Sequence, residues 1–172
     1  MLIHNFRAKL QPYEETLAAW RVLEDYVDRG VIRHLGIVSV HDKEYLTKLH
    51  KDARIQPTII QNRFHSNRGY DVNLRPMLKE FGFKQHQLFW ILTGSAGGKI
   101  NNDVVKQLAD KKGVSPKILL YSFTMELGSA PLIGCKSGEH MKLDIDALVK
   151  NKLKWDKEEL LAMAGLLNKG LI

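Results

Sequence analysis

Short apolar runs alternate with longer stretches of helical periodicity along the whole chain, and this alternation constrains the fold more than any other feature. Each run is short and apolar on both faces, as a buried parallel strand requires. Strands separated by helices predict parallel β-α units. The expected strands are Leu2–His4, Val31–Val40, Pro57–Gln61, Gln87–Leu92 and Pro131–Cys135.

Helix start signals occur between these runs. Asp42 is placed to cap a helix, and Ser115 followed by Pro116 is a strong start. Asp156 and Glu159 have the spacing of a capping box. Helical periodicity or these signals predict helices over residues 17–27, 42–49, 74–81, 104–109, 115–125 and 139–151, and a last one from 156 onward.

Chain length leaves two architectures open for these units. Five β-α units could form an open doubly wound sheet, or part of an eight-unit barrel, which typically needs about 250 residues. The chain has 172 residues, 44% hydrophobic and 26% charged, which suits one globular domain over 1–172 and excludes collagen, coiled coil and disorder. Neither a long apolar segment nor a signal peptide is evident, so we expect no membrane partner.

Charge and cysteine content limit which partners and which cellular compartment are expected. The net charge of +7 favours either an anionic ligand or simply a well-solvated basic surface. The lysines are scattered and no nucleic-acid motif is present, so no nucleic-acid partner is expected. The single cysteine, Cys135, cannot form an internal disulfide, which suits the cytoplasm. No histidine spacing suggests a metal site.

Several segments resemble the aldo-keto reductase family in order and in spacing. The similarity covers roughly residues 2 to 167 and is closest to a fungal-type branch in which Trp replaces the usual Tyr of strand seven. It implies an α/β fold: a partial (β/α)8 TIM barrel of about five parallel units, four to eight, plus a C-terminal helix. The matching segments are 2–4, 19–24 with 30–37, 57–61 with His65, 89–94, 131–137 and 139–144.

The resemblance also implies that the chain is N-terminally truncated, because units one to three have no counterpart. Those units carry the family's catalytic Asp, Tyr and Lys, and the 5 tyrosines of this sequence all lie in or near helical segments. His4 is the candidate catalytic residue that remains, and it would orient the substrate carbonyl. The alternative is a partly buried histidine near a chain end.

Units five to eight imply a binding site for NADP(H). Ser39 and Gln61 would hold the nicotinamide carboxamide, and Trp90 would stack on the ring, although a tryptophan in a strand is more often core. Val38 replaces a polar residue of the family's usual Ser-Asn pair, which removes one contact. The glycine-rich loop that begins with Thr93 and Gly94 would cover the pyrophosphate.

The segment after the last expected strand is similar to the family's phosphate loop. Lys136 and Ser137 would hold the adenosine 2′-phosphate, which favours NADP(H) over NAD(H), unless Lys136 is one solvated lysine among many. His140 lies near the position of an arginine in many members and is a poorer phosphate partner. Asp144 resembles a residue that contacts the adenine. The expected cofactor-binding residues are therefore Ser39, Gln61, Trp90, Thr93, Gly94, Lys136, Ser137, His140 and Asp144.

The functional prediction is the C-terminal, cofactor-binding portion of an NADP(H)-dependent oxidoreductase of aldehydes or ketones, inactive in isolation. Its partners would be a small-molecule carbonyl substrate and, through the open barrel edges at Leu2 and Pro131, further copies of the chain. The alternative is a non-catalytic remnant that acts as a nucleotide-binding or protein-interaction domain.

Overall fold

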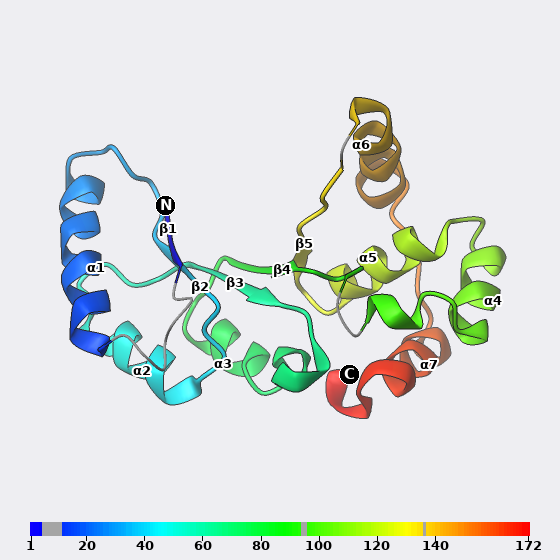
Figure 1. Ribbon diagram of the computed structural model, residues 1–172, viewed down its shortest axis with the longest axis horizontal. Helices are drawn as coiled ribbons and strands as arrows, with labels where there is room; N and C mark the ends of the chain where they lie inside the picture. The colour runs from blue at the N-terminus through cyan, green and yellow to red at the C-terminus, as the bar shows by residue number, and fades with distance from the viewer. Residues whose placement is uncertain (5–11, 94–95, 136) are drawn as a thin grey trace. The chain divides into compact units, whose positions relative to one another are not determined.

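The computed structural model describes residues 1–4, 12–93, 96–135 and 137–172 (Figure 1). The chain divides into two compact units. The first unit comprises Met1–Asn62 and Asn73–Gln87, and the second comprises Arg63–Val72 and Leu88–Ile172. The expectation of a single domain over 1–172 stays a prediction.

Five strands form one sheet in the order β1-β2-β3-β4-β5. In the first unit β2 pairs in parallel with both β1 and β3. The predicted α/β class with parallel β-α units is therefore confirmed, and the strands lie in the sheet in sequence order. The strands are β1 (Leu2–His4), β2 (Gly36–Val38), β3 (Ile59–Arg63), β4 (Gln85–Phe89) and β5 (Ala130–Pro131).

Four of the five predicted strands have wrong bounds, and backbone conformation explains the C-terminal ends of two of them. The run expected over 31–40 is a strand only over Gly36–Val38, and it ends there because Ser39 adopts a left-handed φ of 64°. The run expected over 87–92 is shifted to Gln85–Phe89, because Trp90 has a φ of 61°. A left-handed residue cannot continue a strand. The strand expected over 57–61 is shifted to 59–63, and the one expected over 131–135 covers only 130–131.

Seven α-helices connect and follow the strands in the described residues (Figure 1). The predicted caps are confirmed: the Asp42 carboxylate accepts from the Glu44 and Tyr45 amides, and Asp156 forms a capping box with Glu159. The helices are α1 (Tyr13–Asp28), α2 (Lys43–Asp52), α3 (Arg75–Glu80), α4 (Asp103–Lys111), α5 (Pro116–Glu126), α6 (Gly138–Ile145), continued by a π-helical turn (Asp146–Lys150), and α7 (Lys157–Leu167). None of the helices in the described part of the chain has the length and apolarity needed to cross a bilayer.

The core of the first unit depends on close packing at Gly36 and on one buried indole. A Cβ at Gly36 would lie 2.5 Å from both the Ile59 carbonyl oxygen and the Leu2 side chain, so only glycine fits where β1, β2 and β3 meet. Trp20 of α1 is completely buried, and its indole N–H donates to the Ile55 carbonyl at 2.8 Å. The indole therefore fills the core and keeps its polar atom paired.

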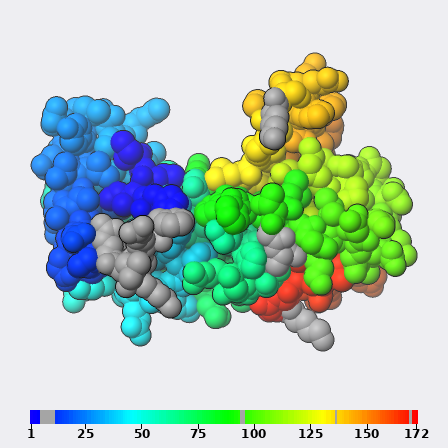
Figure 2. Space-filling view, viewed as in Figure 1, coloured from blue at the N-terminus to red at the C-terminus, as the bar shows by residue number. Residues whose placement is uncertain are grey.

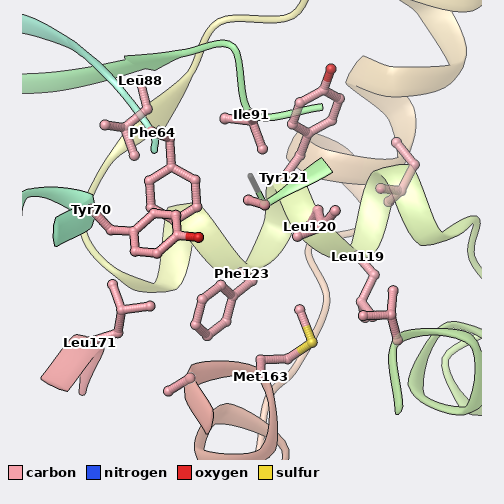
Figure 3. Close-up of a cluster of buried hydrophobic side chains, with 14 of the residues drawn as sticks. Phe64, Tyr70, Leu88, Ile91, Leu119, Leu120, Tyr121, Phe123, Met163 and Leu171 are labelled. Carbon is pink, nitrogen blue, oxygen red and sulfur yellow. The ribbon is translucent and has the colours of Figure 1, made fainter. Parts of the chain in front are cut away.

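The core of the second unit is built around α5, which is buried on all sides from Ile118 to Thr124 (Figure 3). The Phe64 and Tyr70 rings pack with centroids 4.7 Å apart, and Phe123 and Met163 are buried in the same cluster. A helix that is largely apolar on every side has to be covered by neighbouring elements. Helix α5 also packs against β5.

Helix α6 and the π-helical turn leave apolar side chains uncovered in the second unit. Met141, Leu143, Ile145 and Val149 are all exposed, and Figure 2 shows this segment, in gold, at the surface. Clustered exposed apolar side chains are typical of surfaces that another protein segment covers.

A buried carboxylate joins α4 to α7. Glu159 is 6% exposed and accepts from Lys111 at 2.9 Å and from Lys112 at 2.6 Å. Burial alone would raise the pKa of the Glu159 carboxyl, but the hydrogen bonds from Lys112 and Lys111 outweigh it and hold the pKa at about 2, below its ordinary value of 4.5. The ionised form is thus favoured by folding.

We expect Glu159→Gln to lower the free energy of unfolding at pH 7 by about 2 kcal/mol, because hydrogen bonds to a charged group are lost. Since the native pKa is lowered, this stabilisation is present above pH 4.5 and is lost as the pH falls toward 2. Urea unfolding at pH 7, 4 and 3 should show the difference between variant and wild type shrinking with acidity. Glu158→Gln, on an exposed neighbour, is the control; an equal loss there would contradict the assignment.

Candidate cofactor site

Three of the side chains singled out by sequence lie at adjacent positions in the first unit. His4 is opposite Val38 in the β1–β2 pairing, and Val38 is opposite Gln61 in the β2–β3 pairing. The carboxyl ends of parallel strands meet at one edge of a sheet, where α/β barrels place their chemistry. Parallel register therefore brings His4, Val38 and Gln61 into one row, with His4 exposed and Val38 buried.

Ser39 follows this row in a strained conformation that its neighbours hold in place. Its N–H donates to the Gln61 carbonyl at 2.9 Å. The next residue, Val40, is held by the Asn62 side chain, whose Nδ2 donates to the Val40 carbonyl at 2.7 Å and whose Oδ1 accepts from the Val40 N–H at 3.1 Å. A left-handed conformation costs a non-glycine residue about 1–3 kcal/mol and persists only where the surroundings enforce it. Asn62, which is 0% exposed, is the residue that enforces it.

The Gln61 amide belongs to a chain of three side-chain amides. Its Nε2 donates to Gln87 Oε1 at 2.9 Å, and Gln87 Nε2 donates to Gln85 Oε1 at 2.8 Å. A glutamine amide has two N–H groups and an oxygen with two lone pairs, so one hydrogen bond leaves capacity for a ligand. The chain of amides orients Gln61 for such a contact.

In the second unit Trp90 lies directly after β4, with 52% of its surface exposed. The Arg63 guanidinium lies over its ring, 3.8 Å from the centroid, and the Phe89 ring meets it edge-on at 6.1 Å. The side chain thus lies outside the core and presents an aromatic surface. Sequence reasoning placed Trp90 within a strand, and the structure corrects this.

The glycine-rich loop follows Trp90. Thr93 is exposed, and Gly94 lies outside the described residues. A Cβ at Gly97 would be 1.8 Å from the Leu92 carbonyl oxygen, so this glycine is required by close packing of the loop against itself. At Gly98 an added Cβ would meet nothing within 4 Å.

The expected phosphate loop begins helix α6. Lys136 lies outside the described residues. Ser137 is the N-cap, and its Oγ accepts from the His140 N–H at 3.1 Å, while the His140 side chain is exposed. The amino end of an α-helix attracts anions through its N–H groups and dipole. Ser137 and His140 are therefore brought together at one helix end.

Asp144 has a different environment from the one expected. It is 3% exposed, accepts from Lys117 Nζ at 2.6 Å and from the Cys135 thiol at 3.0 Å, and joins α6 to α5. Burial would raise the pKa of the Asp144 carboxyl, but the hydrogen bonds from Cys135 and Lys117 prevail and lower it. The hydrogen bond that the Cys135 thiol donates to Asp144 raises the pKa of the thiol. A contact of this carboxylate with an adenine stays a prediction.

Four residues that matter here were missed by sequence reasoning: Asn62, Arg63, Gln87 and Lys117. Only Asn62 gives a sequence signal, because asparagine is unfavourable within a strand. The others act through partners distant in sequence. Among the described residues no group of three or more His, Cys, Asp or Glu side chains could hold a metal ion.

Comparison with known proteins agrees with this geometry. The model of the aldo/keto reductase family matches residues 1–166, and the chain belongs to that family. Among curated relatives, a D-galacturonate reductase of Hypocrea jecorina is 27% identical over 128 residues, 74% of this chain and 40% of the relative. An aldose reductase of Encephalitozoon cuniculi is 27% identical over 137 residues, 77% of this chain and 44% of the relative. The chain thus spans less than half the length of these relatives.

Solved structures show the same fold. An aldo-keto reductase from a Medee basin deep-sea metagenome library superposes with a TM-score of 0.79 at 19% identity, covering 98% of this chain and 59% of that one. Another aldo-keto reductase, complexed with NADPH, has a TM-score of 0.71 at 13% identity, with 89% and 48% covered. The predicted partial barrel is therefore confirmed, in preference to the doubly wound sheet.

We expect Asn62→Ala to lower the free energy of unfolding by about 2–3 kcal/mol, because it leaves the buried N–H and carbonyl of Val40 unpaired. It should also speed amide exchange at Val40, measured by hydrogen exchange with mass spectrometry. Asn67→Ala, on an exposed asparagine, should change neither quantity. Unchanged exchange at Val40 in the Asn62 variant would show that Asn62 does not hold this turn.

Proposed function

We propose that this chain is the NADP(H)-binding portion of an aldo-keto reductase-type oxidoreductase that acts on aldehydes or ketones. The observation that carries the proposal is the exposed indole of Trp90 directly after β4, at the strand end that the family resemblance assigns to the cofactor. The row of His4, Val38 and Gln61, in which His4 and Val38 end β1 and β2 and Gln61 lies within β3, supports it. A solved structure of the same fold was crystallised with NADPH.

The residues present fit this cofactor in chemical type. Gln61 supplies an amide that can both donate and accept, as a carboxamide requires. Trp90 supplies an exposed aromatic face. Ser137, with Lys136 before it, opens a helix amino end suited to a phosphate. Asp144 fits less well, because Lys117 and Cys135 already engage its carboxylate.

When bound, the cofactor would supply hydride to the carbonyl carbon. His4 would orient the carbonyl oxygen through an imidazole N–H, at the exposed end of β1. Ser39 and Gln61 would fix the carboxamide, and the chain of amides through Gln87 would keep Gln61 in place. The pyrophosphate would be covered by Thr93 and Gly94. The 2′-phosphate would be held by Ser137, His140 and Lys136.

The proton required by the new alkoxide has no evident donor in this sequence. The family resemblance assigns that role to a Tyr assisted by Asp and Lys, in units without a counterpart here. We therefore propose that the segment covered by this sequence is inactive in isolation. Because relatives are named aldose and D-galacturonate reductases, a sugar-like carbonyl compound is the proposed substrate class.

A second function is favoured by the exposed apolar residues of α6 and of the π-helical turn that follows it. Met141, Leu143, Ile145 and Val149 would suit a non-catalytic remnant that binds another protein or a second copy of this chain. Pairing through the edges of β1 and β5 would give homo-oligomers, and a strictly monomeric mass in light scattering would exclude them. The proposed location is the cytoplasm, where a single thiol such as Cys135 stays reduced.

We expect calorimetry to show weak binding of NADP⁺ and still weaker binding of NAD⁺. Lys136→Ala should raise the Kd for NADP⁺ about tenfold, since a charge-assisted hydrogen bond to a phosphate is lost, and should leave NAD⁺ binding unchanged. Lys106→Ala, an exposed lysine of α4, is the matched control. Equal affinity for both dinucleotides would contradict the phosphate-loop assignment.

We expect no appreciable carbonyl reduction by the isolated chain. Loss of a general acid typically costs about 10² to 10⁴ in rate. NADPH oxidation would be followed by absorbance with reactive aldehydes, beside a full-length family member. A turnover number above about 1 s⁻¹ is ordinary for an enzyme and would overturn the prediction of inactivity.

A further inference from the structure

The Arg63–Trp90 pair lies at the point where β3 and β4 end in the second unit. Arg63 is the last residue of β3, and Trp90 is the first residue after β4. The two segments are held side by side by the Phe64 N–H, which donates to the Phe89 carbonyl at 3.1 Å. The guanidinium carbon lies 3.8 Å from the centroid of the Trp90 ring. This is a close cation–π contact.

The backbone and the Phe89 ring fix the orientation of Trp90. Its left-handed φ of 61° turns the chain sharply after β4, and the edge-on Phe89 ring packs at 6.1 Å. An indole has two faces, and the guanidinium lies on one of them. Since the side chain is 52% exposed, the indole still offers aromatic surface to a ligand ring.

We propose that Arg63 makes this site discriminate between the two redox states of the nicotinamide, in favour of the reduced form. This inference rests on the proposed function, in which Trp90 stacks on the nicotinamide. The oxidised ring carries a positive charge and the reduced ring is neutral. A ring stacked on the opposite face of Trp90 would lie roughly 8 Å from the guanidinium, counting the observed 3.8 Å and a close stacking distance of about 4.5 Å.

Two charge effects then act against the oxidised ring. The guanidinium already draws on the negative face potential of the indole, so a second cation gains less from the same ring. Direct repulsion over roughly 8 Å in a half-exposed site corresponds to about a threefold to tenfold difference in affinity. Because the phosphates are the same in both redox states, their contacts cancel in the ratio of the two Kd values. That ratio therefore isolates the charge of the ring.

When both redox forms are present, a site of this kind is occupied by the reduced form in preference, while the overall equilibrium between carbonyl and alcohol is unchanged. The site holds the hydride donor more tightly and releases the oxidised product more readily. Arg63 would be a specificity-determining residue, because its charge acts through Trp90 on the nicotinamide ring.

The test measures the Kd of NADPH and of NADP⁺ for the full chain, by calorimetry and by quenching of tryptophan fluorescence. We expect Arg63→Gln to lower the ratio Kd(NADP⁺)/Kd(NADPH) by about threefold to tenfold. Charge reversal in Arg63→Glu should lower the ratio further. Arg68→Gln removes the same charge from an exposed position of the same unit and should leave the ratio unchanged.

A further measurement uses the unaltered chain and so does not depend on the folding of a variant. Added KCl should lower the ratio, because salt screens the repulsion and weakens phosphate contacts equally for both forms. A ratio that responds neither to KCl nor to Arg63→Gln, while both dinucleotides bind, overturns this inference alone. If Arg63→Gln instead raises the affinity for both forms equally, Arg63 only covers Trp90, and this inference is overturned. Absence of any dinucleotide binding overturns the proposed function together with the inference.

Discussion

The hydrogen-bonded pairing of Asn62 with Val40 is the interaction on which the arrangement of the first unit's strand ends depends. A side-chain amide here does what a backbone amide does elsewhere in a sheet: it satisfies both the N–H and the carbonyl of a neighbouring residue. Because that residue follows Ser39, the reversed backbone at Ser39 has to close onto β3. The ends of β2 and β3 are thereby fixed relative to each other without further backbone pairing between the strands.

The parallel register places side chains together that are far apart in sequence, and it depends on the absence of a side chain at Gly36. With β1, β2 and β3 in close contact at that glycine, His4, Val38 and Gln61 fall into one row. Val38 brings an aliphatic side chain to the middle of a row that is otherwise polar, and it is buried there. The polar groups available to a ligand in the first unit are therefore contributed by the flanking strands and by Ser39, and less by β2 itself.

Sequence patterns predicted which segments become strands and helices better than where each begins or ends. The caps at Asp42, Ser115 and Asp156 depend on neighbours within a few residues, and all three were predicted correctly. The ends of β2 and β4 depend on left-handed residues, Ser39 and Trp90, whose conformation is enforced by tertiary contacts and gives no local signal. The same distinction applies to the site. Residue types such as Gln61 and Trp90 could be selected by resemblance, whereas the partners Gln87 and Arg63 follow only from the tertiary structure.

The two adjacent glycines of the loop after Trp90 place opposite limits on variation among related sequences. At Gly97 the space for a side chain is already taken by the Leu92 carbonyl, so evolution can replace this glycine only by rebuilding the backbone around it. At Gly98 an added side chain would meet nothing within 4 Å, so larger residues can replace this glycine without a steric clash. A loop of constant shape but variable surface would result, with one glycine keeping the shape and the other open to new contacts.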